Sequence, residues 1–522
     1  MSQKRHYSLV ILFLSLGFFI RLTSISNFPS GLCQDEASIG YEAFSILKTG
    51  LDRNGNSYPV HLKSWGSGQN ALYAYLSIPF IHFLGLNTFS VRIVNAIFSC
   101  ISLLLFFLLF RLMADKRKAL AALALFAIFP WSIMSGRWGL ECNIFPAFFL
   151  SAVFFLIKGY SSNQKYYLLS FLLFAISLYA YGTSYLILPI FFLLILPYLF
   201  YTKRISTKYL LVSLSIFIIV SLPIILFVFI NQLDLSPIQI SNISIPRLDA
   251  NRTTAIFNLF NDNFIYTLAK NTVRFLSILL LQSDGNEYNA IPAFGTIYPI
   301  SGIFLFVGLY GVLKNKKFIT EPLHFIFIAW LFASFVLGIT SHVNINRINI
   351  IFIPLLYFVI FGIFEVREML NPALYKNYKN LLIGLYSVYF ILLCGYYITF
   401  FNEKIKDEFS YGLEEAIQFA DKINSTDSIN ITNNTIKMPY IYVCFYNKIN
   451  PEEFRKSVIY DESSFVTGFR AVKKMGRYTF GNKTIADNKI YVVSKTEMSY
   501  ITSDIAFSKE FGNYYVIKFN QR

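Results

Sequence analysis

Charged side chains are scarce in this sequence. Only 14% of its 522 residues are Asp, Glu, Lys or Arg, whereas 55% are hydrophobic and 18% are aromatic. This composition, with a mean hydropathy of +0.52, excludes an ordinary soluble globular protein and is typical of an integral membrane protein. The formal net charge of +16 lies in short clusters between apolar segments rather than on one continuous surface. We therefore expect contacts with membrane lipids and no nucleic acid partner.

Cysteine and histidine are rare as well. Five cysteines cannot make a complete disulfide framework, and the spacing of His61, His82 and His342 matches no metal motif. We expect no required metal or other cofactor, with a divalent cation as the alternative. Cys33 and Cys142 both lie beside acidic residues in segments expected on the same side of the membrane. They are either disulfide-bonded or two unrelated small apolar residues, and the sequence leaves both readings open.

Long hydrophobic runs fill most of the chain. Runs near the length of a membrane-spanning helix, roughly 20 residues, predict about eleven spans. These spans lie near 8–25, 89–112, 119–134, 143–158, 166–181, 184–201, 208–231, 293–313, 321–340, 348–366 and 380–400. The N-terminal segment and the short loops near 114–118, 158–165, 201–208, 314–317 and 367–379 are basic and fall on one side. The positive-inside rule makes that side cytoplasmic, so the odd number of spans places the C terminus outside.

The remaining segments all fall on the outer side. They are a first loop (26–88), a short second loop (135–143), a third loop (232–292) and the tail (401–522). The first apolar run lacks a cleavage pattern of small residues, and we interpret it as an uncleaved helix. The fold class is therefore mainly α, a polytopic membrane domain over 1–400, followed by a small extracytoplasmic α/β domain over 401–522.

The tail has its own pattern of secondary structure. Residues 412–423 show helical spacing of apolar positions, with acidic residues in the first turn. Four segments rich in β-branched and aromatic residues predict strands: 428–432, 440–447, 489–494 and 514–520. The tail shows no nucleophile, metal cluster or phosphate-binding loop, so we expect it to dock an acceptor or to cover the membrane site.

Two adjacent carboxylates stand out in the first outer loop. Asp35 and Glu36 occur in GLCQDEASIG, directly after the first apolar run, and are followed by helical-looking segments suited to the membrane interface. An isolated acid at a membrane surface is more often a solvated loop charge. In a cavity roofed by a long loop, however, a carboxylate can acquire a raised pKa and act as a general base for a hydroxyl or amine.

These features resemble a known family. The Asp35–Glu36 pair after the first helix, Arg92 in NTFSVRIVNA and Glu141 in PWSIMSGRWGLECN are similar to motifs of the protein O-mannosyltransferase and lipid A aminoarabinose transferase group. The resemblance covers most of the membrane part and is strongest over 20–185. It implies the C-type glycosyltransferase fold and a polyprenyl-phosphate sugar donor used on the extracytoplasmic side.

The resemblance also implies roles for these residues. Asp35 matches the catalytic aspartate, which deprotonates the acceptor, and Glu36 matches its partner, which orients the aspartate or the acceptor. Glu141 matches an acid that binds the sugar or acceptor, or a metal if there is one; the alternative is a solvated turn charge. Arg92 matches a family arginine, although relatives often have Arg-Leu-Pro where this chain has Arg92 followed by Ile and Val.

The leaving group gives an independent argument. A lipid phosphate that leaves the sugar gains negative charge, so its site needs fixed cations near the membrane interface. The candidates are Arg92, Arg137, Arg347 and, more weakly, Lys63. For each arginine the alternative is an interaction with lipid headgroups. Two polar residues that could line the same cavity are Asp284 and Asn289 of the segment SDGNEYNAIPAFG.

The sequence therefore predicts an inverting glycosyltransferase of the plasma membrane that transfers a hexose or pentose. Its expected partners are a polyprenyl-phosphate-linked sugar donor and a glycan, lipid or protein acceptor. Two alternatives are a transporter or flippase of lipid-linked sugars and an inactive partner subunit. Transporters tend to place polar sites at the bilayer midplane and to contain paired repeats, whereas the acids here lie in outer loops.

Overall fold

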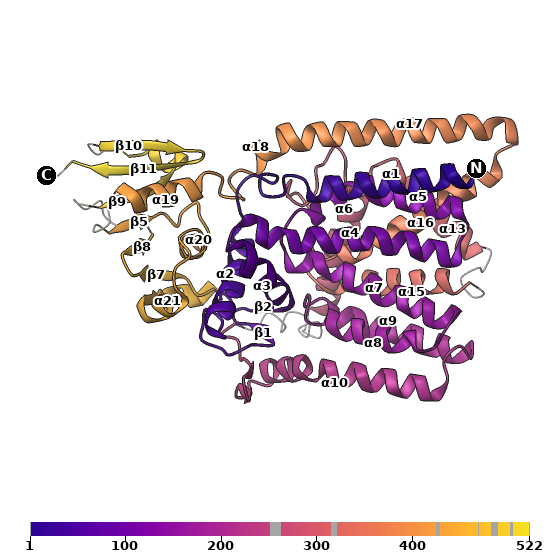
Figure 1. The fold of residues 1–522 in the computed structure, drawn as a ribbon, viewed down its shortest axis with the longest axis horizontal. Coiled ribbons are helices and arrows are strands. Elements are labelled where there is room, and N and C mark those ends of the chain that lie inside the picture. The colour runs from indigo at the N-terminus through magenta and orange to yellow at the C-terminus, as the bar shows by residue number, and fades with distance from the viewer. Residues whose placement is uncertain are drawn as a thin grey trace. The chain divides into compact units, whose positions relative to one another are not determined.

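The computed structural model describes residues 2–250, 263–314, 321–423, 428–467, 469–481, 489–501 and 505–520. The chain forms two compact units (Figure 1). Unit 1 consists of 1–23, 95–225 and 254–401, and unit 2 consists of 24–94, 226–253 and 402–522. Each unit thus contains three segments that are far apart in the sequence. Helices α4 (Thr88–Met113) and α10 (Thr207–Gln232) contribute residues to both units.

Unit 1 is helical. Besides α4 and α10 its helices are α1 (Gln3–Leu22), α5 (Lys116–Ile128), α6 (Pro130–Gly136), α7 (Glu141–Ser161), α8 (Tyr166–Ser177), α9 (Ser184–Tyr201), α12 (Phe264–Leu281), α13 (Ser301–Lys314), α15 (Pro322–Thr340), η2 (Asn349–Ile351), α16 (Phe352–Met369), α17 (Pro372–Tyr396) and η3 (Tyr397–Phe401). Among the described residues, nine helices are long and apolar enough to cross a membrane, or ten if the bent pair α5–α6 forms one span. The prediction of a polytopic helical membrane protein is confirmed.

The number of eleven spans stays a prediction. Every predicted segment contains a helix, but α8 has 12 residues and α13 has 14, which is short for a bilayer. The segment predicted as 119–134 is broken between α5 and α6, whose axes differ by 56°. Pro130 explains this break, because proline lacks the N–H of a helical hydrogen bond and favours an extended conformation in the preceding residue, here Phe129.

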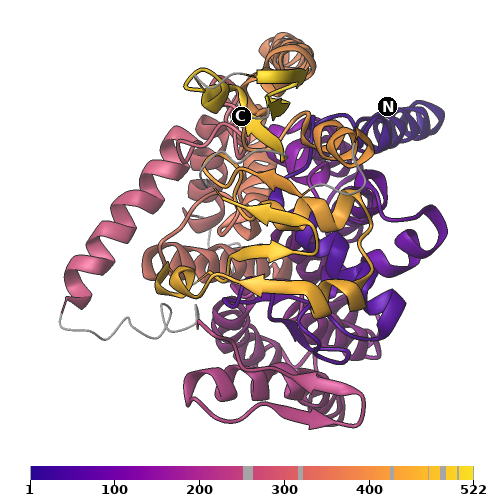
Figure 2. The ribbon, with the colours of Figure 1, turned by 90° about the vertical axis from the view of Figure 1, so that its left-hand side faces the viewer.

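Helix α12 was missed by the sequence analysis, which placed its residues in the outer loop 232–292. Its apolar residues are interrupted by Lys270, Asn271 and Arg274, so the segment lacks a continuous hydrophobic run. In Figure 2 most helices of unit 1 are seen end-on, whereas α12, the long pink helix after a grey segment, is seen side-on. It therefore lies across the direction of the bundle. Although α12 is one of the nine helices counted above by length and composition, this arrangement is typical of a helix at the membrane interface.

Close helix packing and one-sided charge complete unit 1. Gly308 of α13 and Gly362 of α16 face each other so closely that a Cβ atom on either would clash with the backbone of the other helix, as in membrane helix pairs that meet through small residues.

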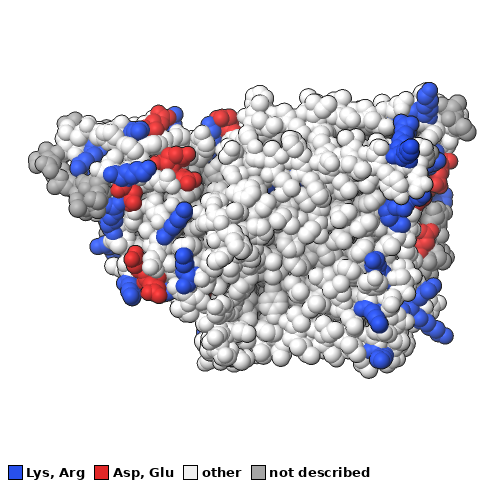
Figure 3. All heavy atoms as spheres, in the orientation of Figure 1, with Lys and Arg blue, Asp and Glu red and all other residues white. Residues whose placement is uncertain are grey.

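Lys and Arg side chains gather at the end of this unit where the N terminus lies, and the sides of the helices are almost free of charge (Figure 3). Such uncharged sides suit contact with lipid.

Unit 2 combines the first loop with the tail. Its first-loop elements are α2 (Gln34–Thr49), β1 (His61–Leu62), β2 (Gln69–Asn70) and α3 (Leu72–Leu84), and the hairpin of β3 (Ile238–Ile240) and β4 (Ile243–Ile245) follows α10. The tail contributes α18 (Asn402–Ile405), α19 (Leu413–Ile423), α20 (Pro439–Tyr446), α21 (Pro451–Ser457), η4 (Glu462–Thr467) and α22 (Lys495–Met498). The tail also forms a seven-stranded sheet, visible in Figure 2.

The sheet of the tail is mixed. Its strand order is β10-β11-β9-β5-β8-β7-β6, with β5 (Ile429–Ile431), β6 (Val458–Tyr460), β7 (Val472–Met475), β8 (Tyr478–Phe480), β9 (Ile490–Ser494), β10 (Ile505–Phe511) and β11 (Tyr514–Phe519). The central strand β5 is parallel to β8 and β9, and the other pairs are antiparallel. Part of the core consists of Tyr491, Ile517 and Phe519. The predicted α/β character of the tail is confirmed.

One predicted strand is wrong. Residues 440–447 were expected to be extended, but they belong almost entirely to helix α20. Every residue of α20 is buried, so the apolar run shows neither helical nor strand periodicity and cannot be assigned by pattern alone. Pro439 occupies the first turn of the helix, where its missing N–H costs nothing. The predicted helix over 412–423 and the other three predicted strands are confirmed as α19, β5, β9 and β11.

Candidate active site

The segment that carries the acidic pair is held to α4 by one arginine. Arg92 and Glu36 are both fully buried, and the guanidinium meets the carboxylate at two points, Nε to Oε1 at 2.7 Å and Nη2 to Oε2 at 2.9 Å. The other three N–H groups of Arg92 donate to the carbonyl oxygens of Ile25, Pro29 and Gly31 at 2.7–2.9 Å. All five donors of the guanidinium are therefore used within unit 2. This geometry gives Arg92 a positioning role, and phosphate binding by Arg92 stays an untested prediction.

Asp35 lies in the first turn of α2, directly before Glu36. Glu36 accepts a hydrogen bond from the backbone N–H of Cys33 at 3.2 Å, which closes the start of the helix. The Asp35 side chain is half-buried in the first turn of the helix. Arg92 thus fixes the backbone from which Asp35 projects, while Glu36 serves as the buried anchor of the pair.

The inner face of α2 carries a second buried charge pair. Arg53 contacts Glu42 through its Nε at 3.3 Å and through its backbone N–H at 2.8 Å. The same guanidinium donates to the hydroxyls of Ser38 at 2.7 Å and Ser64 at 3.3 Å. Burial raises the pKa of Glu42 to about 7, while the charge of Arg53 opposes that shift. Because Ser38 lies one turn after Asp35 and Ser64 follows Lys63, Arg53 connects two parts of the candidate site.

Lys63 lies in the turn between β1 and β2. Its ammonium group forms an ion pair with Asp249 at 2.7 Å, and both side chains are about three-quarters buried. Gly66 of the same turn accepts a backbone hydrogen bond from Ala250. The turn is thus attached to the segment that follows β4, and the charge of Lys63 is balanced within unit 2.

In unit 1 the short loop with Glu141 is held by three asparagine side chains. Asn95 and Asn143 donate to the carbonyl oxygen of Trp138 at 2.8 and 3.1 Å, and Asn349 donates to the carbonyl oxygen of Cys142 at 2.7 Å. Glu141 is the first residue of α7 and is half-buried. The sequence analysis missed Asn95 and Asn349, although a buried asparagine inside an apolar run is a recognisable signal.

Arg137 precedes this loop at the end of α6. It is 5% exposed, donates to the carbonyl oxygen of Ile20 at the end of α1, and lies 5.9 Å from the ring centre of Tyr397. The backbone carbonyl and the aromatic ring both favour a positive charge in this buried place. Arg137 therefore brings a fixed cation close to the Glu141 loop of unit 1.

Asp284 joins two turns of unit 1. Its carboxylate accepts hydrogen bonds from the Asn289 side chain at 2.7 Å, from the Asn286 N–H at 3.0 Å and from the Ile345 N–H at 3.0 Å. Asp284 and Asn289 are both 5% exposed. These contacts fix the turn that carries Arg347, whose side chain is exposed.

Arg347 differs from the other candidate cations. One of its Nη atoms donates to the carbonyl oxygen of His342 at 2.6 Å. The guanidinium is otherwise on the exposed side of the turn. Among the candidate cations, Arg347 is thus the one whose guanidinium is exposed at the protein surface.

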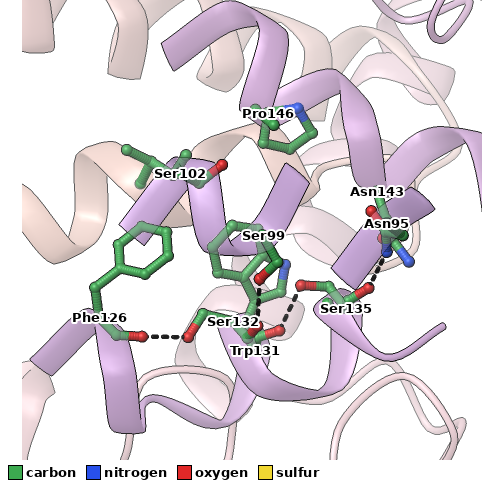
Figure 4. A pocket seen from close by; sticks show the side chains of 12 residues that line it. Asn95, Ser99, Ser102, Phe126, Trp131, Ser132, Ser135, Asn143 and Pro146 are labelled. Atoms are coloured by element: carbon green, nitrogen blue, oxygen red, sulfur yellow. Dashed lines mark hydrogen bonds between the residues drawn. The ribbon is translucent and has the colours of Figure 1, made fainter. Parts of the chain in front are cut away.

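A small polar cavity lies behind the Glu141 loop, within unit 1 (Figure 4). It has a volume of about 20 Å³ and is lined by the hydroxyls of Ser99, Ser132 and Ser135 and the amides of Asn95 and Asn143. A space of this size holds one or two water molecules and is far too small for a sugar. The cavity is therefore part of the polar packing around the Glu141 loop and is not a substrate pocket.

Arg21 supports the same region and was also missed by the sequence analysis. It is fully buried at the end of α1. Its five N–H groups donate to the hydroxyls of Ser99 and Ser132 and to the carbonyl oxygens of Gly17, Phe126 and Ala127 at 2.8–3.2 Å. Arg21 thereby satisfies carbonyl groups that the break between α5 and α6 leaves without helical partners.

The structure groups the predicted site residues by unit. Unit 2 contains Asp35, Glu36, Arg92 and Lys63, and unit 1 contains Glu141, Arg137, Arg347, Asp284 and Asn289. Within the described part of the chain, no three His, Cys, Asp or Glu residues come together as a possible metal site. All five cysteines belong to the described residues, and none of them forms a disulfide there.

Comparisons with known proteins agree with this architecture. The family model of dolichyl-phosphate-mannose-protein mannosyltransferase matches residues 71–227. The structure is similar to that of ArnT from Cupriavidus metallidurans bound to undecaprenyl phosphate, with 13% identity, a TM-score of 0.55 and 97% of each chain covered. The apo state of that ArnT gives 12% identity, a TM-score of 0.54 and 98% of each chain covered. The comparison with curated protein sequences gave no match.

The class of protein follows from these similarities. The chain is a multi-pass membrane protein with the C-type glycosyltransferase fold, because the likeness to ArnT extends over nearly the whole length of both chains. This confirms the fold expected from the sequence resemblance. The segment 71–227 is in addition similar to the protein mannosyltransferase family, which is one of the two groups that the resemblance named.

Proposed function

We propose that the chain is an inverting glycosyltransferase that moves a monosaccharide from a polyprenyl-phosphate donor to an acceptor outside the plasma membrane. The fold shared with ArnT, whose structure contains undecaprenyl phosphate, and the match to a mannosyltransferase family model support this class. The observation that carries the proposal is the placement of Asp35. It is a half-buried carboxylate at a helix N terminus whose backbone is fixed by the buried Arg92–Glu36 pair.

The reaction needs one base and one leaving group. The acceptor oxygen or nitrogen attacks the anomeric carbon of the sugar from the face opposite the phosphate, and the bond between that carbon and the phosphate oxygen breaks. The acceptor proton passes to Asp35, and the lipid leaves as a phosphate monoester. One displacement inverts the anomeric configuration. Asp35 acts as general base, and Glu36, which Arg92 holds in an ion pair, acts as a positioning residue.

The lipid phosphate gains charge as it leaves, and fixed cations stabilise that charge. Arg347 is suited to this role because its guanidinium is exposed. Lys63 is suited only if it exchanges its present partner Asp249 for the phosphate. Arg137 adds a nearby positive charge to the Glu141 loop, and we assign Glu141 to binding of the sugar or the acceptor.

The orientation in the membrane is part of the proposal. Basic side chains gather at the end of unit 1 that contains the N terminus (Figure 3), and such clusters face the cytoplasm in membrane proteins. The N terminus is then cytoplasmic, and Asp35, at the other end of the first span, is extracytoplasmic. The donor is reached from the lipid, and the acceptor, a glycan, lipid or protein, arrives from outside.

A labelled-donor assay tests the proposal. Purified protein in liposomes is incubated with a panel of undecaprenyl-phosphate hexoses and pentoses together with glycan, lipid or peptide acceptors. Release of undecaprenyl phosphate and formation of the glycosylated acceptor are followed by mass spectrometry. We expect release that is lost in Asp35→Asn, while binding of undecaprenyl phosphate is retained. Movement of the donor across the vesicle without release of the phosphate supports a flippase, and binding without either event supports an inactive subunit.

A further inference from the structure

The hairpin of β3 and β4 exposes an unusual amount of apolar surface. Its side chains Ile238, Ile240 and Ile243 are 37%, 57% and 49% exposed, and Leu233 and Leu235, which lead into it, are 63% and 48% exposed. Every residue from 233 to 243 is exposed. A cluster of large aliphatic side chains of this kind marks a surface that is covered by something apolar.

Charge is confined to the base of the hairpin. No residue from 235 to 246 is charged, and the nearest ionic groups, Asp234 and Arg247, form an ion pair at 2.9 Å. The tip carries only the small polar residues Ser241 and Asn242 between isoleucines. This pattern avoids the cost of placing a net charge in a region of low polarity.

The hairpin is also firmly attached. Ser244 exchanges backbone hydrogen bonds with Val60 and Ser57 at 3.0 and 2.9 Å. Asn231, near the end of α10, bonds the backbone on the far side of the hairpin, at Pro246 and Leu248, at 3.1 and 2.7 Å. The exposed isoleucines are therefore presented by an ordered element.

The position of the hairpin in the chain identifies what covers it. It follows α10 directly, and α10 is a candidate membrane span whose exposed apolar side chains include Phe229. Exposed apolar side chains thus continue from the helix through Leu233 and Leu235 to the isoleucines, and the one exposed acid among them, Asp234, is paired with Arg247. A surface that continues the lipid-facing side of a membrane helix, at the depth where that helix ends, meets the lipid interface.

We propose that the β3–β4 hairpin inserts its isoleucines into the membrane interface at the C-terminal end of α10. The partner is the bilayer itself, at the boundary of headgroups and acyl chains. The hairpin is connected to the candidate site because Asp249, just beyond β4, pairs with Lys63 at 2.7 Å. Insertion therefore sets the depth of the Lys63 turn relative to the lipid headgroups. The insertion itself does not depend on the proposed function.

Fluorescence quenching tests the insertion. Ile238→Cys and Ile240→Cys, each in a chain with Cys394→Ala because the other four native cysteines are buried, are labelled with an NBD dye and reconstituted into phosphatidylcholine liposomes. Ile459→Cys is the matched control, since Ile459 is 53% exposed on strand β6 of the same unit. We expect doxyl-labelled lipids to quench positions 238 and 240 several-fold more than position 459, and aqueous iodide to show the opposite order.

Two results would overturn the proposal. Strong iodide quenching at 240, equal to that at 459, would place the hairpin in water. Protection from both quenchers would show that protein, such as a second copy of the chain, covers the isoleucines. Neither result bears on the glycosyltransferase proposal, which is decided separately by release of undecaprenyl phosphate in the Asp35→Asn comparison.

Discussion

Arg92 and Glu36, 56 residues apart in the sequence, form a fully buried two-point ion pair. The remaining N–H groups of Arg92 bind three backbone carbonyl groups of the segment before α2. The pair therefore works as a clamp between α4 and the segment that carries Asp35. Its importance for stability and for activity can be separated by experiment.

Arg92→Ala should destabilise the protein by about 3–5 kcal/mol, the usual cost of removing one partner from a buried ion pair. Arg92→Lys should recover only part of this stability, because an ammonium cannot make the two-point contact or reach all three carbonyl groups. Thermal melting in detergent measures both variants. If Arg92→Lys behaves like the wild type, the two-point geometry is not what holds the segment.

Asp35→Asn should lower turnover by a factor on the order of 10² to 10⁴ while undecaprenyl phosphate binds as before, because the amide keeps the size of the side chain but cannot take a proton. Glu36→Gln should have a smaller effect on turnover. Asp115→Asn, which alters an exposed cap of α5, serves as the control acid. Near-normal turnover of a well-folded Asp35→Asn protein would exclude Asp35 as the base, and Glu141 would be the next candidate.

Arg347→Ala should weaken binding of undecaprenyl phosphate about tenfold, which corresponds to about 1.4 kcal/mol, because the exposed guanidinium contacts the carbonyl oxygen of His342 and, among the described residues, pairs with no carboxylate. Lys63→Ala should weaken it less, since Asp249 already balances Lys63. Asp249→Asn should strengthen binding if the freed ammonium reaches the phosphate. Native mass spectrometry or calorimetry measures all three variants; equal, small effects would assign both cations to lipid headgroups.

Cysteine labelling in intact cells should place the two ends of the bundle on opposite sides. Glu408→Cys and Lys437→Cys, whose native side chains are half or more exposed, should react with an impermeant maleimide. Lys116→Cys and Arg204→Cys, both exposed positions of unit 1, should react only after the membrane is permeabilised. The reverse pattern would contradict the proposed orientation.

Acid should destabilise the first loop through His61. Burial lowers the pKa of His61 to about 4 from its ordinary value of 6.5, so the neutral ring stabilises the fold above pH 6.5, and this contribution is lost as the pH falls toward 4. Linkage gives a loss of about 2 kcal/mol between pH 7 and pH 5. His61→Gln should flatten this pH dependence of thermal melting. His82→Gln, at an exposed position of α3, should leave it unchanged.

The sequence by itself determined the class of the molecule. Hydrophobic runs identify membrane helices because a helix in lipid must make all its backbone hydrogen bonds within itself and present apolar side chains to the lipid. Both requirements are local and can be recognised in a short stretch of sequence. For the same reason α19, β5, β9 and β11 could be predicted from short patterns, and the acidic pair stood out as charge beside an apolar run. The resemblance in the segments around Asp35, Arg92 and Glu141 added the fold.

The tertiary structure decided what depends on distant partners. Helix α20 was mistaken for a strand because burial on all sides removes periodicity, and α12 was missed because Lys270 and Arg274 interrupt its apolar residues. Arg92 stood out in the sequence as a candidate, but its contact with Glu36 joins segments that are distant in the chain. The grouping of the first loop, the β3–β4 hairpin and the tail into one unit likewise rests on long-range packing, which no local pattern encodes.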